Sequence, residues 1–108
     1  LIAGGKDKGA DFSILRLPVR ERVRAMVLIG AAKDKLREVF ADCCELHEAG
    51  DMPEAVRLAF RLAHPEGVVL LSPGCASFDM FEDFEHRGKV FKESVRDLKE
   101  RDSANLDR

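Results

Sequence analysis

The feature that most constrains this fold is a regular alternation of short apolar runs with segments of helical periodicity. Apolar runs lie at Leu1–Ala3, Ala25–Ile29 and Val68–Leu71, and each is followed by glycine or by Ser72-Pro73-Gly74. Buried strands have this composition and stop at such turn signals. We expect a weaker strand at about Cys43–His47, where the alternation of strands and helices requires one. The sequence therefore predicts an α/β fold with a mostly parallel sheet and helices on both faces.

Apolar residues at helical spacing predict two helices between these strands. The first begins at about Ala32, and the second has a start signal of its own at Asp51. Asp51 can accept hydrogen bonds from the free amides of the first turn, while Glu54 reaches back and Pro53 fits early in that turn. We therefore expect a well-defined helix start at Asp51. The apolar faces comprise Leu36, Val39 and Phe40 in the first helix, and Ala55, Leu58, Ala59 and Leu62 in the second.

A long helix is predicted at the C-terminal end of the chain. From Phe81 to Leu98, apolar residues recur every three or four positions. The apolar stripe includes Gly88, where we expect a close neighbour or a kink. Residues after about Lys99 are polar without periodicity and are expected to fray. With no internal repeat and no linker, residues 1–108 are predicted to form one domain.

Composition limits the possible partners. The chain has 108 residues, with 18 basic and 20 acidic side chains mixed along it and a net charge of -2. No large basic face is available for phosphates, so nucleic acid is not an expected partner. No apolar run approaches the roughly 20 residues of a membrane helix, so we expect no membrane partner and a cytoplasmic protein. The chain opens on an expected strand without a methionine, and we expect it to be a fragment whose upstream part is missing.

The loops after the first and last strands are the candidate ligand sites, because open parallel sheets bind ligands beyond the carboxyl ends of their strands. The first loop, residues 4–11, combines glycines with Lys6 and Lys8, which can hold an anion. It matches neither a dinucleotide fingerprint nor a phosphate loop, and a solvated turn explains it equally well. The second loop, residues 72–77, leads to a helix N-terminus, which favours a carboxylate or phosphate. Ser77 caps that helix unless Asp79 does, and in the second case the Ser77 hydroxyl is free for a ligand.

Other chemically active side chains have simpler interpretations. Cys43, Cys44 and Cys75 match no usual zinc spacing, and we interpret them as buried reduced thiols. The three histidines have no visible nucleophile partner, and the acidic residues around Asp83 fit capping and a solvated helix face. We therefore predict no catalytic residue and no metal ligand in this chain. The phenylalanines of the last helix are expected by default to pack in the core. Phe84 is nevertheless near enough to the Ser77 loop to form the wall of a small pocket.

Two segments, Leu1–Phe12 and Leu70–Phe81, closely resemble the C-terminal domain of the Mur ligase family of cell-wall enzymes, and the similarity extends through Phe91. The branch they resemble joins D-glutamate to UDP-N-acetylmuramoyl-L-alanine. The second segment is specific, because its order of serine, proline, cysteine, alanine and serine before an aromatic helix is a hallmark of the family. Gly74 and Phe78 depart from the alanine and leucine that the family often has, and neither change removes a polar contact.

The resemblance implies a Rossmann-like domain that positions D-glutamate and closes over an ATP-binding domain. It also implies that Lys8 and Ser77 hold a D-glutamate carboxylate, with contributions from Phe78 and Phe84. ATP, magnesium and UDP-N-acetylmuramoyl-L-alanine are expected to bind mainly to domains outside this chain. The N-terminal strand and helix of the domain are expected to be missing, and the fragment alone is not expected to catalyse ligation.

Two alternatives remain open. The chain is alternatively the equivalent domain of another Mur ligase or of a folylpolyglutamate synthase, although the Lys8 loop argues for the D-glutamate enzyme. From another functional class, a noncatalytic α/β module could use the Ser72–Ser77 loop to bind a phosphate or a carboxylate.

Overall fold

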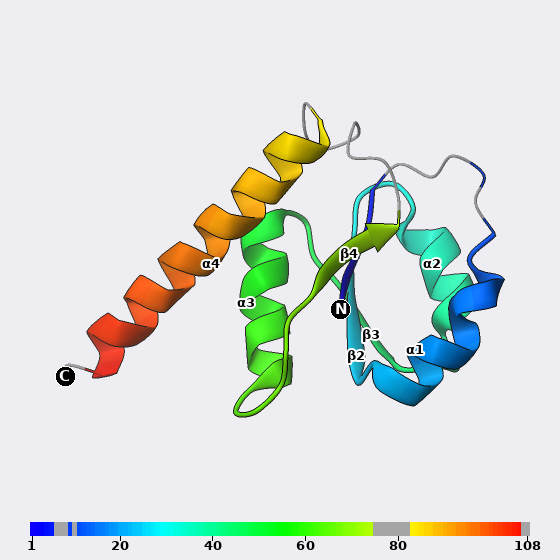
Figure 1. The fold of residues 1–108 in the computed structure, drawn as a ribbon, viewed down its shortest axis with the longest axis horizontal. Helices are drawn as coiled ribbons and strands as arrows, with labels where there is room; N and C mark the ends of the chain where they lie inside the picture. The colour runs from blue at the N-terminus through cyan, green and yellow to red at the C-terminus, as the bar shows by residue number, and fades with distance from the viewer. Residues whose placement is uncertain (6–8, 10, 75–82, 107–108) are drawn as a thin grey trace.

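The fold is built around one parallel sheet. The computed structural model describes residues 1–5, 9, 11–74 and 83–106. In this part of the chain, four parallel strands lie in the order β3-β2-β1-β4 (Figure 1). The strands are β1 (Ile2–Gly4), β2 (Ala25–Ile29), β3 (Glu45–Glu48) and β4 (Leu71–Gly74). The predicted parallel sheet is confirmed, and the weak third strand lies within two residues of its expected position.

Helices cover both faces of this sheet, as the sequence predicts. One side carries α1 (Arg16–Arg22), preceded by a 3-10 turn at Ser13–Leu15, and α2 (Lys33–Phe40). The other side carries α3 (Met52–Ala63) and α4 (Phe84–Leu106), as Figure 1 shows. From β1 the chain adds β2 and then β3 on one side of β1. It then passes along the other face of the sheet through α3 and forms β4 on the opposite side of β1.

Strand β2 explains why the sequence shows continuous apolar runs instead of a two-residue alternation. Met26 and Leu28 pack in the core on the side of α1 and α2. Val27 and Ile29 pack in the core on the side of α3. Because both faces are covered, all five residues of β2 are buried. The two cores are thus separated by the sheet and share its central strands.

The start of α3 confirms the predicted capping signal. The Asp51 carboxylate accepts a hydrogen bond from the Glu54 backbone N–H at 2.9 Å, and a proline lies in the first turn. The Glu54 carboxylate accepts from the Gly50 backbone N–H at 3.0 Å, one residue before the cap. Two exposed backbone donors at this end of the helix are therefore satisfied.

Helix α1 is an element that the sequence does not predict. Only Val19 of its seven residues is buried, so it has no recognisable apolar face. An ion pair anchors it instead: the Arg16 guanidinium donates to the Asp42 carboxylate at 2.7 Å and also to the Val39 carbonyl oxygen. Arg20 approaches the same carboxylate at 3.1 Å. The hydrogen bond from Arg16 lowers the pKa of Asp42 to about 2, so this carboxylate stays charged to a lower pH than an ordinary aspartate.

Strand β4 lies later in the chain than predicted. The predicted strand covers Val68–Leu71, with a turn at Ser72-Pro73-Gly74, but the structure places β4 at Leu71–Gly74. Its pairing with β1 decides the position, because Ile2 donates to the Leu70 carbonyl oxygen at 2.9 Å and Gly4 pairs with Gly74. A proline is tolerated in β4 because this strand lies at the edge of the described sheet.

Helix α4 differs from its prediction at both ends. It begins at Phe84 and continues to Leu106, so the expected fraying after Lys99 is wrong. Lysine, glutamate and arginine in this stretch favour a helix even without an apolar face. A Cβ atom added to Gly88 would meet no described residue within 4 Å, so the close neighbour expected there is not found in that part of the chain. Val90, Phe91 and Leu98 pack on the α3 side of the sheet instead.

Candidate functional site

The two candidate loops leave the sheet from neighbouring strands. Gly4, the last residue of β1, pairs with Gly74, the last residue of β4. Because the strands are parallel, both loops start at the same carboxyl edge of the sheet, where α/β proteins bind ligands. Lys8, Ser77 and Phe78 lie outside the described residues, so the structure defines the frame of this candidate site.

The start of the first loop is fixed against the neighbouring strand. Gly4 has φ +133°, and a Cβ atom there would lie 1.9 Å from the Ile29 carbonyl oxygen. Gly5 donates to that same oxygen at 3.1 Å and accepts from the Ala32 backbone N–H at 2.8 Å. The close backbone approach expected of these glycines is thus made to the end of β2 and the start of α2.

The far end of the first loop is anchored in the core. The Asp11 carboxylate accepts from the Ser13 backbone N–H at 3.0 Å and from the Ser13 hydroxyl at 2.6 Å, and these bonds lower the pKa of Asp11. Phe12 is buried, with the Lys35 ammonium 5.2 Å from its ring centroid. The loop that contains Lys8 therefore connects two fixed points, Gly5 and Phe12.

The first described residues after the second loop belong to the start of α4. The Asp83 carboxylate accepts from the His86 backbone N–H at 2.7 Å, which is the contact of a capping residue. Asp83 therefore caps α4, whereas the sequence suggests Ser77 or Asp79, both of which lie outside the described residues. Figure 1 shows the start of α4 at the same end of the molecule as the carboxyl end of β4.

Phe84 is the one predicted site residue that the structure describes. It is the first residue of α4, and 70% of its surface is exposed. The default expectation that it belongs to the core is wrong, although Phe91 does pack in the core on the α3 side. An exposed ring at this position is available to a ligand at the carboxyl edge.

No second chemical site emerges from the titratable side chains of the described residues. They contain no group of three or more histidine, cysteine or acidic side chains that could hold a metal ion. Cys43 is a buried free thiol, as predicted, whereas the free thiol of Cys44 is only partly buried, and this burial raises the pKa of Cys44. Cys75 lies outside the described residues. His47 lies in β3, 3.5 Å from the Glu45 carboxylate, and His64 packs against the Phe60 ring.

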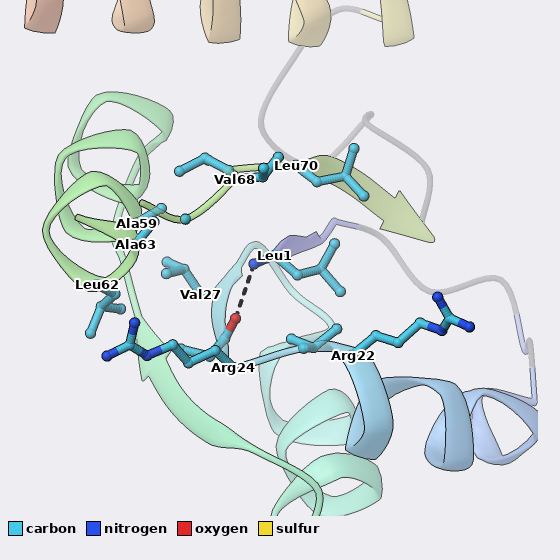
Figure 2. A pocket seen from close by; sticks show the side chains of 13 residues that line it. Leu1, Arg22, Arg24, Val27, Ala59, Leu62, Ala63, Val68 and Leu70 are labelled. Carbon is cyan, nitrogen blue, oxygen red and sulfur yellow. Dashed lines mark hydrogen bonds between the residues drawn. The ribbon is translucent and has the colours of Figure 1, made fainter. Parts of the chain in front are cut away.

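A pocket lies at the amino edge of the sheet, opposite the candidate site. It encloses about 430 Å³ between Leu1, the end of α3 and the segment before β4 (Figure 2). Val68 and Leu70 form part of its wall. The sequence signal for it is the apolar run predicted as the last strand, because all of that run except Leu71 precedes β4. None of the helices in the described residues is long and apolar enough to cross a membrane.

Comparison with known proteins identifies relatives at high similarity, although no family model matches the chain. The chain is 51% identical over 104 residues to the UDP-N-acetylmuramoylalanine–D-glutamate ligase of Desulfosudis oleivorans, covering 96% of the chain and 23% of the relative. It is 49% identical over 98 residues to the ligase of the same name from Chlorobaculum parvum, covering 91% of the chain and 21% of the relative. The Legionella pneumophila (strain Paris) ligase of that name is 53% identical over 98 residues, with 91% and 22% covered.

The chain thus spans about a fifth of the length of these curated relatives. The sequences are about half identical over more than nine tenths of the chain, which is far more similarity than unrelated sequences share. The chain therefore belongs, as a fragment, to the family of UDP-N-acetylmuramoylalanine–D-glutamate ligases.

Proposed function

We propose that this chain is the C-terminal, D-glutamate-binding domain of a ligase that joins D-glutamate to UDP-N-acetylmuramoyl-L-alanine in peptidoglycan synthesis. The observation that carries the proposal is the pairing of Gly4 with Gly74, which brings the starts of the two candidate loops together at the carboxyl edge. The names of the relatives favour D-glutamate over the acceptor of another Mur ligase or of a folylpolyglutamate synthase. They also favour a ligase over a noncatalytic anion-binding module.

In the proposed site, the Lys8 ammonium and the Ser77 hydroxyl hold a carboxylate of D-glutamate, and Phe78 and Phe84 form an apolar wall. Lysine supplies a point charge and serine a hydrogen-bond donor, which together fix the carboxylate. The anchoring of Gly5 and Phe12 supports this role, because it fixes the two ends of the segment that contains Lys8. The exposed ring of Phe84 supports the wall.

The contribution of this chain to the reaction is to position the nucleophile. The new amide bond joins the amine of D-glutamate to an activated carboxyl group of UDP-N-acetylmuramoyl-L-alanine, and holding the carboxylate directs that amine. ATP and magnesium supply the activation and bind mainly to other parts of the parent protein. We place the parent enzyme in the cytoplasm, a compartment that suits the free thiols of Cys43 and Cys44.

Alanine substitutions in the intact parent ligase test the site. A charge-assisted hydrogen bond contributes about 1.5–3 kcal/mol, so we expect Lys8→Ala and Ser77→Ala each to raise the KM for D-glutamate about 10- to 100-fold. The KM for ATP should be unchanged. Lys92→Ala, which removes an exposed lysine from α4, is the matched control and should leave both constants unaltered. Normal D-glutamate kinetics in both site variants would overturn the assignment, and a loss of stability alone in Ser77→Ala would reduce that residue to a structural role.

A further inference from the structure

Both ends of the segment that contains Lys8 are held by α2. The Gly5 carbonyl oxygen accepts a hydrogen bond at 2.8 Å from the backbone N–H of Ala32, the residue before α2 begins. The ring of Phe12 is buried, and the ammonium group of Lys35 in α2 lies 5.2 Å from its centroid. Any movement of the chain after Phe12 relative to α2 would therefore displace one end of the Lys8 segment.

The chain after Phe12 has little apolar packing to hold it against α2. Within residues 11–22, only Phe12 and Val19 are buried. Ile14 is 77% exposed and Leu17 is 64% exposed, so most of the apolar surface of this stretch faces solvent. A helix with one buried side chain is weakly fixed by burial, because hydrophobic stabilisation scales with the apolar area removed from water.

Polar contacts with the far end of α2 hold this stretch in place. The Arg16 guanidinium donates to the carbonyl oxygen of Val39, in the last turn of α2, and to the Asp42 carboxylate at 2.7 Å. Carbonyl groups in the last turn of a helix have no partner within the helix, so a cation is favoured there. Arg20, one turn further along α1, donates to the same carboxylate at 3.1 Å. Two arginines of α1 thus converge on one carboxylate just beyond α2.

The exposure of these groups argues against a main role in stability. The Arg16 and Asp42 side chains are 37% and 61% exposed, and ion pairs that water reaches contribute little to folding. We propose that Arg16 and Asp42 are positioning residues for the D-glutamate site, because their ion pair fixes α1 against α2 and thereby fixes where the Lys8 segment ends. The inference rests on the proposed function, since Lys8 must hold the substrate for its placement to matter. Arg16 and Asp42 act through the backbone that joins α1 to Lys8.

Kinetics of the intact parent ligase test this role. Asp42→Ala removes the carboxylate that both arginines contact, so we expect the KM for D-glutamate to rise about 3- to 10-fold while the KM for ATP stays unchanged. Asp42→Glu keeps a carboxylate at this exposed position and should restore a KM close to that of the unsubstituted enzyme. When Lys8→Ala is already present, Asp42→Ala should add no further rise, because the charge that the ion pair positions is gone.

Glu48→Ala is the matched control. Glu48 is 43% exposed on β3 and pairs with Arg37 of α2 at 3.4 Å, so this variant removes a comparable surface ion pair that does not involve α1. It should leave both KM values unchanged.

The outcomes separate this inference from the proposed function. An unchanged KM for D-glutamate in Asp42→Ala, beside a raised one in Lys8→Ala, would overturn the inference and leave the proposed site standing. So would an equal rise when Asp42→Ala is added to the unsubstituted enzyme and to the Lys8→Ala variant. A normal KM for D-glutamate in Lys8→Ala would overturn the proposed role of Lys8, and this inference with it.

Discussion

Gly4 and Gly88 have opposite surroundings, so alanine should have opposite effects at these positions. At Gly4 the added methyl group would lie 1.9 Å from a backbone oxygen, and φ is +133°. We expect Gly4→Ala to lower the free energy of unfolding by about 2 kcal/mol or more. Gly88 lies inside α4 with no described residue within 4 Å of an added Cβ atom, so Gly88→Ala should raise it by about 0.5–1 kcal/mol. Urea denaturation of both variants measures this contrast, and changes of the same sign would contradict it.

At this scale, the sequence predicts the kind of residue needed but not what that residue contacts. The glycines after β1 are recognisable as a place where backbone comes close, yet the partner is the Ile29 carbonyl oxygen of the chain itself. That contact joins residues far apart in the sequence and depends on the order of the strands. The roles of Lys8, Ser77 and Phe78 come from the family resemblance and remain predictions, because these residues lie outside the described ones.

The start of α3 is the element boundary that the sequence predicts best, and its cap can be tested directly. Asp51→Ala removes the acceptor for the Glu54 backbone N–H, so we expect the free energy of unfolding to fall by about 1 kcal/mol. Asp51→Asn keeps an oxygen in the same place and should cost only a few tenths of that. Thermal denaturation of the two variants separates the cap from the charge. Equal losses in both would show that the negative charge at the helix N-terminus, rather than the hydrogen bond, is the stabilising feature.

Boundaries set by long-range contacts are the ones that the sequence misplaces. The Asp51 cap depends on residues four positions apart or fewer, and it is predicted correctly. The position of β4 depends on pairing with β1, which lies nearly seventy residues away, so the apolar run alone points to the wrong residues. Helix α1 is held by an ion pair to Asp42 instead of an apolar face, and hydrophobic periodicity therefore cannot reveal it.

The whole fold is predictable because burial on both faces leaves a strong signal in the central strands. All five residues of β2 are apolar and buried, and α2, α3 and α4 are recognisable from their periodicity. The candidate site is less predictable, since the pairing of Gly4 with Gly74 brings its two loops together only once the strand order is known. Apolar runs and their alternation with helices indicate that four strands exist, but they do not order the strands across the sheet.

Two cores that share the central strands should unfold together. Leu36 is 1% exposed in the core on the α2 side, and Met52 is 1% exposed in the core on the α3 side. We expect Leu36→Ala and Met52→Ala each to lower the free energy of unfolding by about 2–5 kcal/mol, through lost burial and the cavity left behind. Because β1 and β2 contribute side chains to both cores, each variant should retain a single cooperative transition. Hydrogen exchange should then show faster global opening on both faces of the sheet in either variant. Faster exchange confined to α2 in the first variant, or to α3 in the second, would show instead that the two sides of the sheet are separate folding units.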